Sequence, residues 1–110
     1  MTHAVIFEKF GSHEIVGFQT EGHAGYADAG SDIVCAAISV LVINTINSVE
    51  QFTDSDCTVT QDEENAGIYF RVNSSKNPKE LQVLLQSLVL GLSGVAEGNA
   101  DYLSITFKEV

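Results

Sequence analysis

Five short stretches of this 110-residue chain have patterns typical of β-strands: the first two are rich in β-branched and aromatic residues, and in the last three hydrophobic and polar residues alternate. These stretches cover residues 4–10, 15–22, 57–61, 68–72 and 101–109. Residues of turn-forming type at 11–14 and 62–67 join the first two stretches and the next two, so we predict two β-hairpins. In the last stretch, Leu103, Ile105 and Phe107 would share one face of a closing strand.

Residues 31–52, between the two hairpins, predict a long helix. The segment is apolar almost all round, so we expect it to be largely buried. Its β-branched residues would also suit a strand, but its length exceeds that of a normal strand. Ser31 is expected to be the N-cap, and Asp32 suits the positive end of the helix dipole.

Residues 77–98 predict a second helix with a clear start signal. Asn77 would cap it, Pro78 would take the first helical position, and Glu80 would complete a pattern like a capping box. Its apolar residues recur at helical spacing and predict core packing. They are Leu81, Leu84, Leu85, Leu88, Leu92 and Val95.

The predicted order of elements is therefore ββαββαβ. We expect one domain over residues 1–110, with a five-stranded mixed or antiparallel sheet and two helices packed on it. The fold class is α+β. The halves share the order hairpin then helix, but no similarity of residues, so no internal repeat is inferred.

Composition limits the classes of partner. The net charge of −10, from 15 acidic and 5 basic residues, argues against binding to nucleic acid. We find no secretory leader and no run that approaches the roughly 18 apolar residues of a membrane span, so we expect a cytoplasmic protein without a membrane partner. Cys35 and Cys57 fit no zinc-finger spacing; one disulfide between them is possible, although the cytosol would keep both reduced.

The stretch "GHAGYADAGSDIVCAAIS", residues 22–39, contains the candidate chemistry. His23 lies in a segment rich in glycine, predicted to be a loop, and Cys35 lies about one turn into the predicted helix. The start of a helix stabilises a thiolate, and a nearby histidine can activate the thiol and later protonate a leaving amine. Free amides of the first turn could bind an oxyanion. These parts suit acyl transfer.

Two further residues share a helix face with Cys35. Asp32 precedes it by three positions and could orient His23, or it could only cap the helix. Ser39 follows by four positions and could contact the substrate or the thiol, or bond back to the helix backbone. A cysteine in such an apolar run is also, on general grounds, a small core residue, which is the reading we give Cys57. The histidines and cysteines form no metal-ligand cluster, so no metal or cofactor is expected.

This motif resembles that of the ribosomal-processing cysteine proteases, the Prp family. The matching residues are Gly22, His23, Gly30, Asp32, Cys35 and Ser39. The length and the order of predicted elements are also similar, so the resemblance covers essentially the whole chain.

The resemblance implies an activity. Members remove a short N-terminal extension from the precursor of ribosomal protein L-twenty-seven, are cytoplasmic, and tend to form homodimers. The extension carries consecutive aromatic residues near the cleaved bond, with lysines beyond it. Cys35 would be the nucleophile and His23 the general base and acid. Gly22, Gly30, Asp32, Ser39 and Tyr26 would support the site or contact substrate.

Two other classes of function remain open at this point. One is a non-catalytic ribosome-assembly or peptide-binding module, which would keep the loop but not depend on a thiol. The other is a redox sensor, in which peroxide reversibly oxidises Cys35. Thiol alkylation would separate an accessible Cys35 from a cysteine buried in the core.

Overall fold

The computed structural model describes residues 1–22 and 29–110, and for residues 29–32 it describes the backbone alone. The order ββαββαβ and the α+β class are confirmed. The elements are β1 (Thr2–Glu8), β2 (Ile15–Glu21), α1 (Ala29–Phe52), β3 (Ser55–Asp62), β4 (Gly67–Ser75), α2 (Pro78–Ala96) and β5 (Leu103–Glu109). Both predicted hairpins form, and the strands of the second are longer than the sequence pattern indicated.

The strands form one mixed sheet in the order β3-β4-β2-β1-β5. The neighbours β1–β2, β2–β4 and β3–β4 are antiparallel, whereas β5 runs parallel to β1. The parallel pair follows from topology, because the chain crosses over through α2 before it returns beside β1. Since β2 is a central strand, its carboxyl end, at Gly22, emerges in the middle of the sheet.

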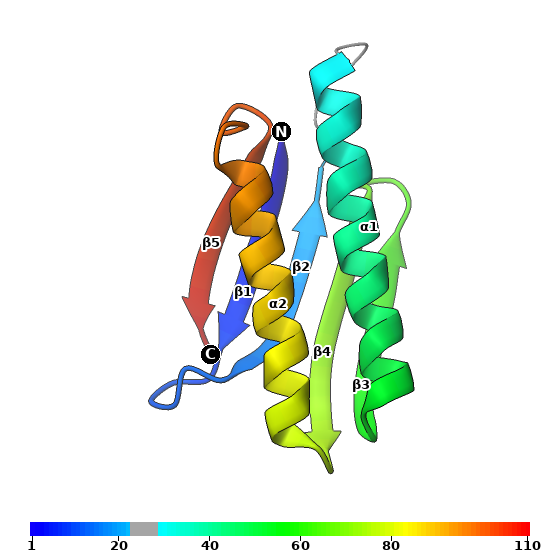
Figure 1. Ribbon diagram of the computed structural model, residues 1–110, viewed down its shortest axis with the longest axis vertical. Coiled ribbons are helices and arrows are strands. Elements are labelled where there is room, and N and C mark those ends of the chain that lie inside the picture. Colours follow the sequence, from blue (N-terminus) through cyan, green and yellow to red (C-terminus); the bar gives the residue numbers. More distant parts are fainter. Residues whose placement is uncertain (23–28) are drawn as a thin grey trace.

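Both helices cover the same face of the sheet, so the molecule has two layers (Figure 1). The core lies between the layers. Phe18 of β2 stacks on Phe70 of β4 with ring centroids 4.9 Å apart. On α2, the buried residues are Leu81, Leu85, Leu88 and Leu92, as the sequence pattern predicted.

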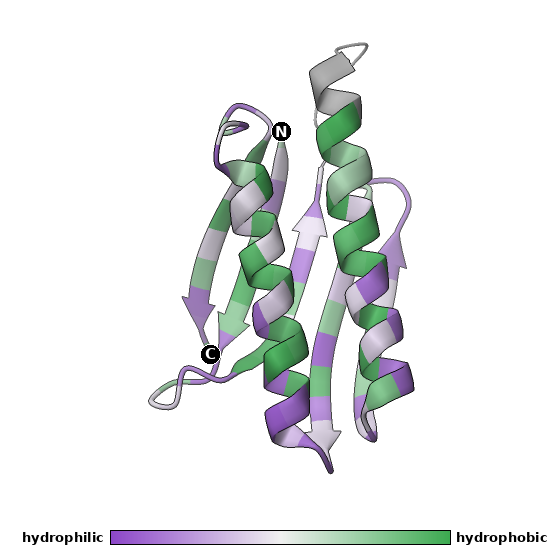
Figure 2. Ribbon diagram, viewed as in Figure 1, coloured by the Kyte–Doolittle hydropathy of each residue, from purple (hydrophilic) through white to green (hydrophobic). Residues whose placement is uncertain are grey.

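The prediction that the long helix is largely buried is wrong. One side of α1 packs into the core through Val34, Ile38, Val42 and Val49. Other apolar residues of α1, among them Ile33, Val40 and Ile43, are exposed. Hydrophobic residues alternate with polar ones along both helices (Figure 2). A two-layer fold can bury only one side of each helix, because no third layer covers the other side.

The expectation about membrane spans also needs correction. Ile33–Phe52 is long and apolar enough to cross a membrane, with a mean hydropathy of 1.8. The same helix contributes four residues to the core against the sheet, so we describe it as a core helix of a globular fold.

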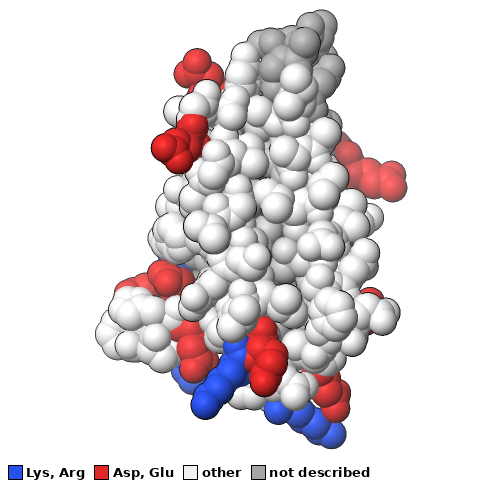
Figure 3. Space-filling model, viewed as in Figure 1, with Lys and Arg blue, Asp and Glu red and all other residues white. Residues whose placement is uncertain are grey.

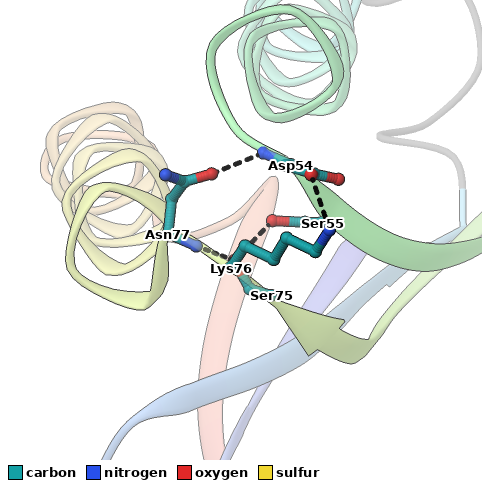
Figure 4. A network of polar contacts seen from close by, with 5 residues as sticks. All are labelled: Asp54, Ser55, Ser75, Lys76 and Asn77. Carbon is teal, nitrogen blue, oxygen red and sulfur yellow. Dashed lines mark hydrogen bonds and ion pairs between the residues drawn. The ribbon is translucent and has the colours of Figure 1, made fainter.

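The start of α2 is as predicted, with Asn77 before it and Pro78 as its first residue, whereas the start of α1 and the capping bond of Asn77 differ from the prediction. The first helix begins at Ala29, so Ser31 lies inside it. Asn77 precedes α2, but its side chain makes no capping hydrogen bond. Asn77 Oδ1 instead accepts a hydrogen bond from the backbone N–H of Asp54, at 2.7 Å (Figure 4). The side chain of Asn77 therefore ties the start of α2 to the connection between α1 and β3.

Candidate active site

Cys35 opens onto a small cavity where α1 crosses the end of β2. The cavity has a volume of about 190 Å³. Besides α1, its walls come from β1, from β2 and the residue after it, from the β3–β4 turn and from β4. They are Thr2, Thr20, Gly22, Cys35, Ile38, Ser39, Val42, Ala66 and Ile68. A volume below the roughly 300–1,000 Å³ of small-molecule sites suits one or two side chains of a peptide better than a cofactor.

The two cysteines have different surroundings. Cys57 packs against the hydrophobic core, as predicted, whereas Cys35 is half-buried and faces the cavity. Burial, together with the negative charge of Asp56, raises the pKa of the Cys57 thiol. Both residues are present as thiols, not as a disulfide. The reading of Cys35 as a small core residue is therefore not supported by its position.

Gly22 has two reasons to be glycine. Its φ of +96° lies in the left-handed region, and a Cβ atom there would come within 2.6 Å of the carbonyl oxygen of Met1. Its N–H donates a hydrogen bond to the carbonyl of Asn65, at 2.9 Å, in the turn between β3 and β4. Gly22 thus fixes the chain at the edge of the cavity, and His23 is the next residue along.

The structure brings three of the expected site residues together: Gly22, Cys35 and Ser39 all line the cavity. Ser39 lies one turn after Cys35 on α1, as the spacing predicted. Gly30 and Asp32 lie in the first residues of α1, and the side chain of Asp32 is outside the described part of the structure.

The two remaining expected residues, His23 and Tyr26, also lie outside the described residues. Their roles stay predictions. The structure describes the chain on both sides of them, up to Gly22 at the cavity and again from the start of α1.

The position of Cys35 in its helix changes one chemical expectation. Because α1 begins at Ala29, Cys35 is the seventh residue of the helix, more than one turn from its start. Only the first four N–H groups of a helix lack an acceptor within it, here those of residues 29–32. The N–H of Cys35 is not among them. If amides of the first turn bind the oxyanion, they lie more than one turn before Cys35 in the helix.

Sequence reasoning missed the part that the β3–β4 turn and the N-terminal strand play in this cavity. Thr2 and Thr20 are buried polar residues of its wall, and Ala66 reaches it from the turn. No sequence pattern predicts that these residues lie near Cys35, because the pairing of strands in the sheet brings them there. A buried threonine in a strand gives no local signal of this kind.

Carboxylates surround this end of the molecule. Glu21 directly precedes Gly22, and its Oε2 accepts a hydrogen bond from the hydroxyl of Tyr69, at 2.8 Å. That bond, with the negative charge of Glu21, holds the pKa of Tyr69 above its usual value. Glu63 and Glu64 lie in the β3–β4 turn beside Ala66. The side chain of Asn65 donates to Asp62, at 2.7 Å, and lowers the pKa of that carboxyl.

Two larger hollows lie elsewhere on the molecule. One of about 560 Å³ lies over Gly17 and Arg71, and one of about 640 Å³ lies beside α2 next to Phe107. Neither has a cysteine in its wall, and His13 of the second is an exposed residue. The smaller cavity at Cys35 therefore remains the candidate site, since its wall contains the residue that the motif predicts as the nucleophile.

Comparison with known proteins identifies relatives of similar length. The sequence profile described as "Cysteine protease Prp" matches residues 1–104. The ribosomal processing cysteine protease Prp of Bacillus subtilis is 27% identical over 100 residues, covering 86% of this chain and 89% of that protein. The protein of the same description from Staphylococcus aureus (strain Mu50) is 26% identical over 88 residues, covering 80% of this chain and 82% of that protein.

Solved structures share the fold. The ribosomal processing protease Prp of S. aureus, in complex with a substrate peptide, superposes with a TM-score of 0.86 at 22% identity, covering 98% of this chain and 100% of that chain. SMU.848 of Streptococcus mutans superposes with a TM-score of 0.85 at 26% identity, covering 100% of this chain and 96% of that chain. The two-layer ββαββαβ architecture is therefore common to this chain and these proteins.

Proposed function

This chain belongs to the cysteine protease Prp family, and from that premise we propose that it removes the N-terminal extension from the precursor of ribosomal protein L-twenty-seven. The family resemblance inferred from the His-to-Cys motif is confirmed, and the chain is a cysteine protease. The observation that carries the proposal further is the cavity itself. It joins Cys35 to Gly22, the residue that precedes His23.

In the proposed mechanism, His23 takes the proton of the Cys35 thiol, and the thiolate attacks the carbonyl carbon of the scissile bond. A carbon–sulfur bond forms, and the carbonyl oxygen becomes an oxyanion. The carbon–nitrogen bond then breaks as His23 gives its proton to the leaving amine. Water, activated by the same histidine, hydrolyses the thioester and releases Cys35. The half-buried position of Cys35 supports this role, because the residue lines the cavity and is not part of the hydrophobic core cluster.

Supporting residues follow from their places around the cavity. Ser39 lies on the wall one turn beyond the thiol, where it would contact the substrate. Asp32, one turn before Cys35 along α1, would orient His23 or serve only the helix start. Gly22 fixes the chain that leads into His23. Gly30, in the first turn of α1, and Tyr26, which precedes the helix in sequence, would contact substrate.

The proposed substrate suits the charge at this end of the molecule. Glu21, Glu63 and Glu64 lie close in sequence to the wall residues Gly22 and Ala66. Negative charge here would attract the lysines of the extension and raise the rate of encounter. We further propose that the protein acts in the cytoplasm as a homodimer, as members of the family tend to do.

The test is cleavage of a peptide that carries the extension, followed by mass spectrometry. We expect wild type to make a single cut, and Cys35→Ala and His23→Ala to make none. Cys57→Ala is the matched control, since it removes the other thiol and should retain activity. Cutting by Cys35→Ala as fast as by wild type would refute the proposal. Binding of the intact peptide without any cut by wild type would instead indicate a peptide-binding module.

A further inference from the structure

The described residues bury three polar side chains, and all three are threonines: Thr2, Thr20 and Thr45. Two of them have a hydrogen bond. Thr45 Oγ1 donates to the carbonyl of Leu41 at 2.7 Å, and Thr2 Oγ1 donates to the carbonyl of Gly22 at 3.4 Å. The side chain of Thr20 makes no hydrogen bond to any described residue, although it is only 5% exposed. Thr20 therefore needs an explanation, since buried hydroxyl groups are nearly always paired.

The hydroxyl of Thr20 opens onto the cavity that Cys35 lines. In the described part of the molecule, every fully enclosed side-chain oxygen or nitrogen atom has a partner. The unpaired oxygen of Thr20 is therefore not fully enclosed, and the cavity is the open space that Thr20 borders. Thr20 pairs with Ala4 on one side and with Ile68 on the other, so both neighbours in its row of the sheet are apolar. One hydroxyl thus lies on the sheet side of the cavity, in apolar surroundings.

Packing against the core does not account for a threonine at this position. Valine has the same shape, suits a strand equally well, and would bury a methyl group where Thr20 has an unpaired hydroxyl. Replacing an unpaired hydroxyl by an apolar group of the same shape is neutral or stabilising. A ligand atom in the cavity would give the hydroxyl the partner that the protein itself does not provide.

The remaining wall limits the kind of group that can occupy the cavity. Ile38, Val42 and Ile68 are aliphatic, and apart from the thiol of Cys35 the wall has no ionisable side chain. A charged group would lose its hydration here without gaining an opposite charge, which disfavours acidic and basic side chains. An uncharged side chain with an apolar stem and a hydrogen-bonding tip would contact the aliphatic wall along its stem and Thr20 at its tip. Tyrosine and glutamine have this chemistry.

We propose that the cavity is a specificity pocket for one uncharged side chain of the peptide substrate, and that the hydroxyl of Thr20 selects a side chain with a hydrogen-bonding tip. The proposal rests on the proposed function, because it takes the substrate to be a peptide cleaved at Cys35. A pocket built to hydrogen-bond a substrate group rejects the analogue without that group, because the buried hydroxyl is then left unpaired. Ser39, on the helix side of the wall, is exposed and selects less, since solvent can reach it.

The test changes Thr20 and the substrate together. Peptides with the extension carry, at one residue near the scissile bond at a time, tyrosine or phenylalanine, or glutamine or methionine. The members of each pair differ in their tip but little in size. At one position, wild type should cleave the polar member of a pair with a kcat/KM at least about 10-fold above that of the apolar member. Thr20→Val should lose this preference, and Thr20→Ser should restore it.

The matched control is Thr45→Val. Thr45 is also a buried threonine, 6% exposed, but it lies outside the cavity wall, so its variant should keep the preference. Thermal unfolding reports folding, and Thr20→Val should be at least as stable as wild type. Calorimetric titration of the same peptides into Cys35→Ala, with and without Thr20→Val, measures selection without cleavage. A wild type that cleaves no peptide would refute the proposed function, whereas a preference in binding that depends on Thr20 would still support the pocket.

Three results would overturn the proposal. One is the absence of any preference for a polar tip, at every position and in both assays. Another is a preference that Thr20→Val retains. The last is an equal fall in the cleavage of every peptide by Thr20→Val, which would assign the hydroxyl to the reaction and not to a substrate side chain.

Discussion

Two residues of the candidate site, Cys35 and Gly22, each have a counterpart of the same type elsewhere in the chain with different surroundings. Cys35 and Cys57 are both half-buried, yet one faces a cavity and the other packs on the core. Gly22 and Gly11 both have positive φ angles, yet only Gly22 has backbone within reach of an added Cβ. These contrasts within one chain provide matched pairs for experiment.

The two thiols should react at different rates. Burial and the charge of Asp56 raise the pKa of Cys57, so its thiolate fraction at pH 8 is lower than that of an ordinary thiol. We expect iodoacetamide to modify Cys35 at least several times faster than Cys57 in the folded protein. Intact-mass kinetics on Cys35→Ala and Cys57→Ala separate the two sites. Equal rates in the folded state would contradict the difference in their surroundings.

Gly22→Ala should destabilise the protein more than Gly11→Ala. Both substitutions force a side chain into a positive φ, which costs about 1–2 kcal/mol. At Gly22 the new Cβ would also meet the carbonyl oxygen of Met1 at 2.6 Å, whereas at Gly11 no atom lies within 4 Å. Urea unfolding measures the two free energies. If Gly11→Ala lost as much stability as Gly22→Ala, the contact with Met1 would be unimportant.

The elements are held in place by a few bonds from side chains to backbone as well as by the core. Gln82 of α2 binds both the N–H and the carbonyl of Ile15, each at 2.8 Å, where β2 begins. The side chain of Asn77, before α2, accepts a hydrogen bond from Asp54, which directly precedes β3, and so links the start of α2 to the start of β3. These bonds set the position of α2 along the sheet, which apolar packing alone fixes less sharply.

Gln82→Ala should lower the free energy of unfolding by about 1–3 kcal/mol, because it leaves the N–H and carbonyl of Ile15 without their partner. Gln86→Ala, one turn later on the same helix and exposed, should change it by less than about 0.5 kcal/mol. Chemical denaturation of both variants tests the comparison. A loss of the same size in Gln86→Ala would contradict the importance of the bond to Ile15, since alanine favours the helix at least as well as glutamine.

At the scale of the whole molecule, charge and apolar surface are separated. The middle of the outward helical surface is uncharged, while acidic and basic residues lie at its edges (Figure 3). Individual ion pairs contribute little to stability: Lys76 and Asp54 lie 3.5 Å apart, but their side chains are 83% and 73% exposed. The net charge acts instead through the long-range field.

Salt should slow cleavage of a basic substrate. Under the proposed function, kcat/KM for an extension peptide with its lysines should fall several-fold between about 20 and 200 mM ionic strength, because salt screens the attraction. The matched control is the same peptide with glutamine in place of lysine, which should respond much less. The two peptides would respond alike if attraction between the chain and lysine were unimportant.

The sequence alone determined the order ββαββαβ, the two hairpins and the core stripe of α2, because period and turn chemistry are local properties. The motif also led to the correct family. The start of α1 was wrong, because Ser31 lies within the helix. The start of α2 at Pro78 was right, but the side chain of Asn77 bonds to Asp54 and not to its own helix. Caps depend on which partner is nearest in space, and sequence spacing does not contain that information.

Only the tertiary structure decided what surrounds Cys35 and what α1 leaves exposed. The cavity combines residues as distant in sequence as Thr2 and Ile68, because the sheet places β1, β2 and β4 side by side beneath the helix. The apolar composition of α1 predicted burial, but a two-layer fold covers only one side of a helix. A sequence records how apolar each residue is, whereas the packing of layers determines which apolar residues remain available to a partner.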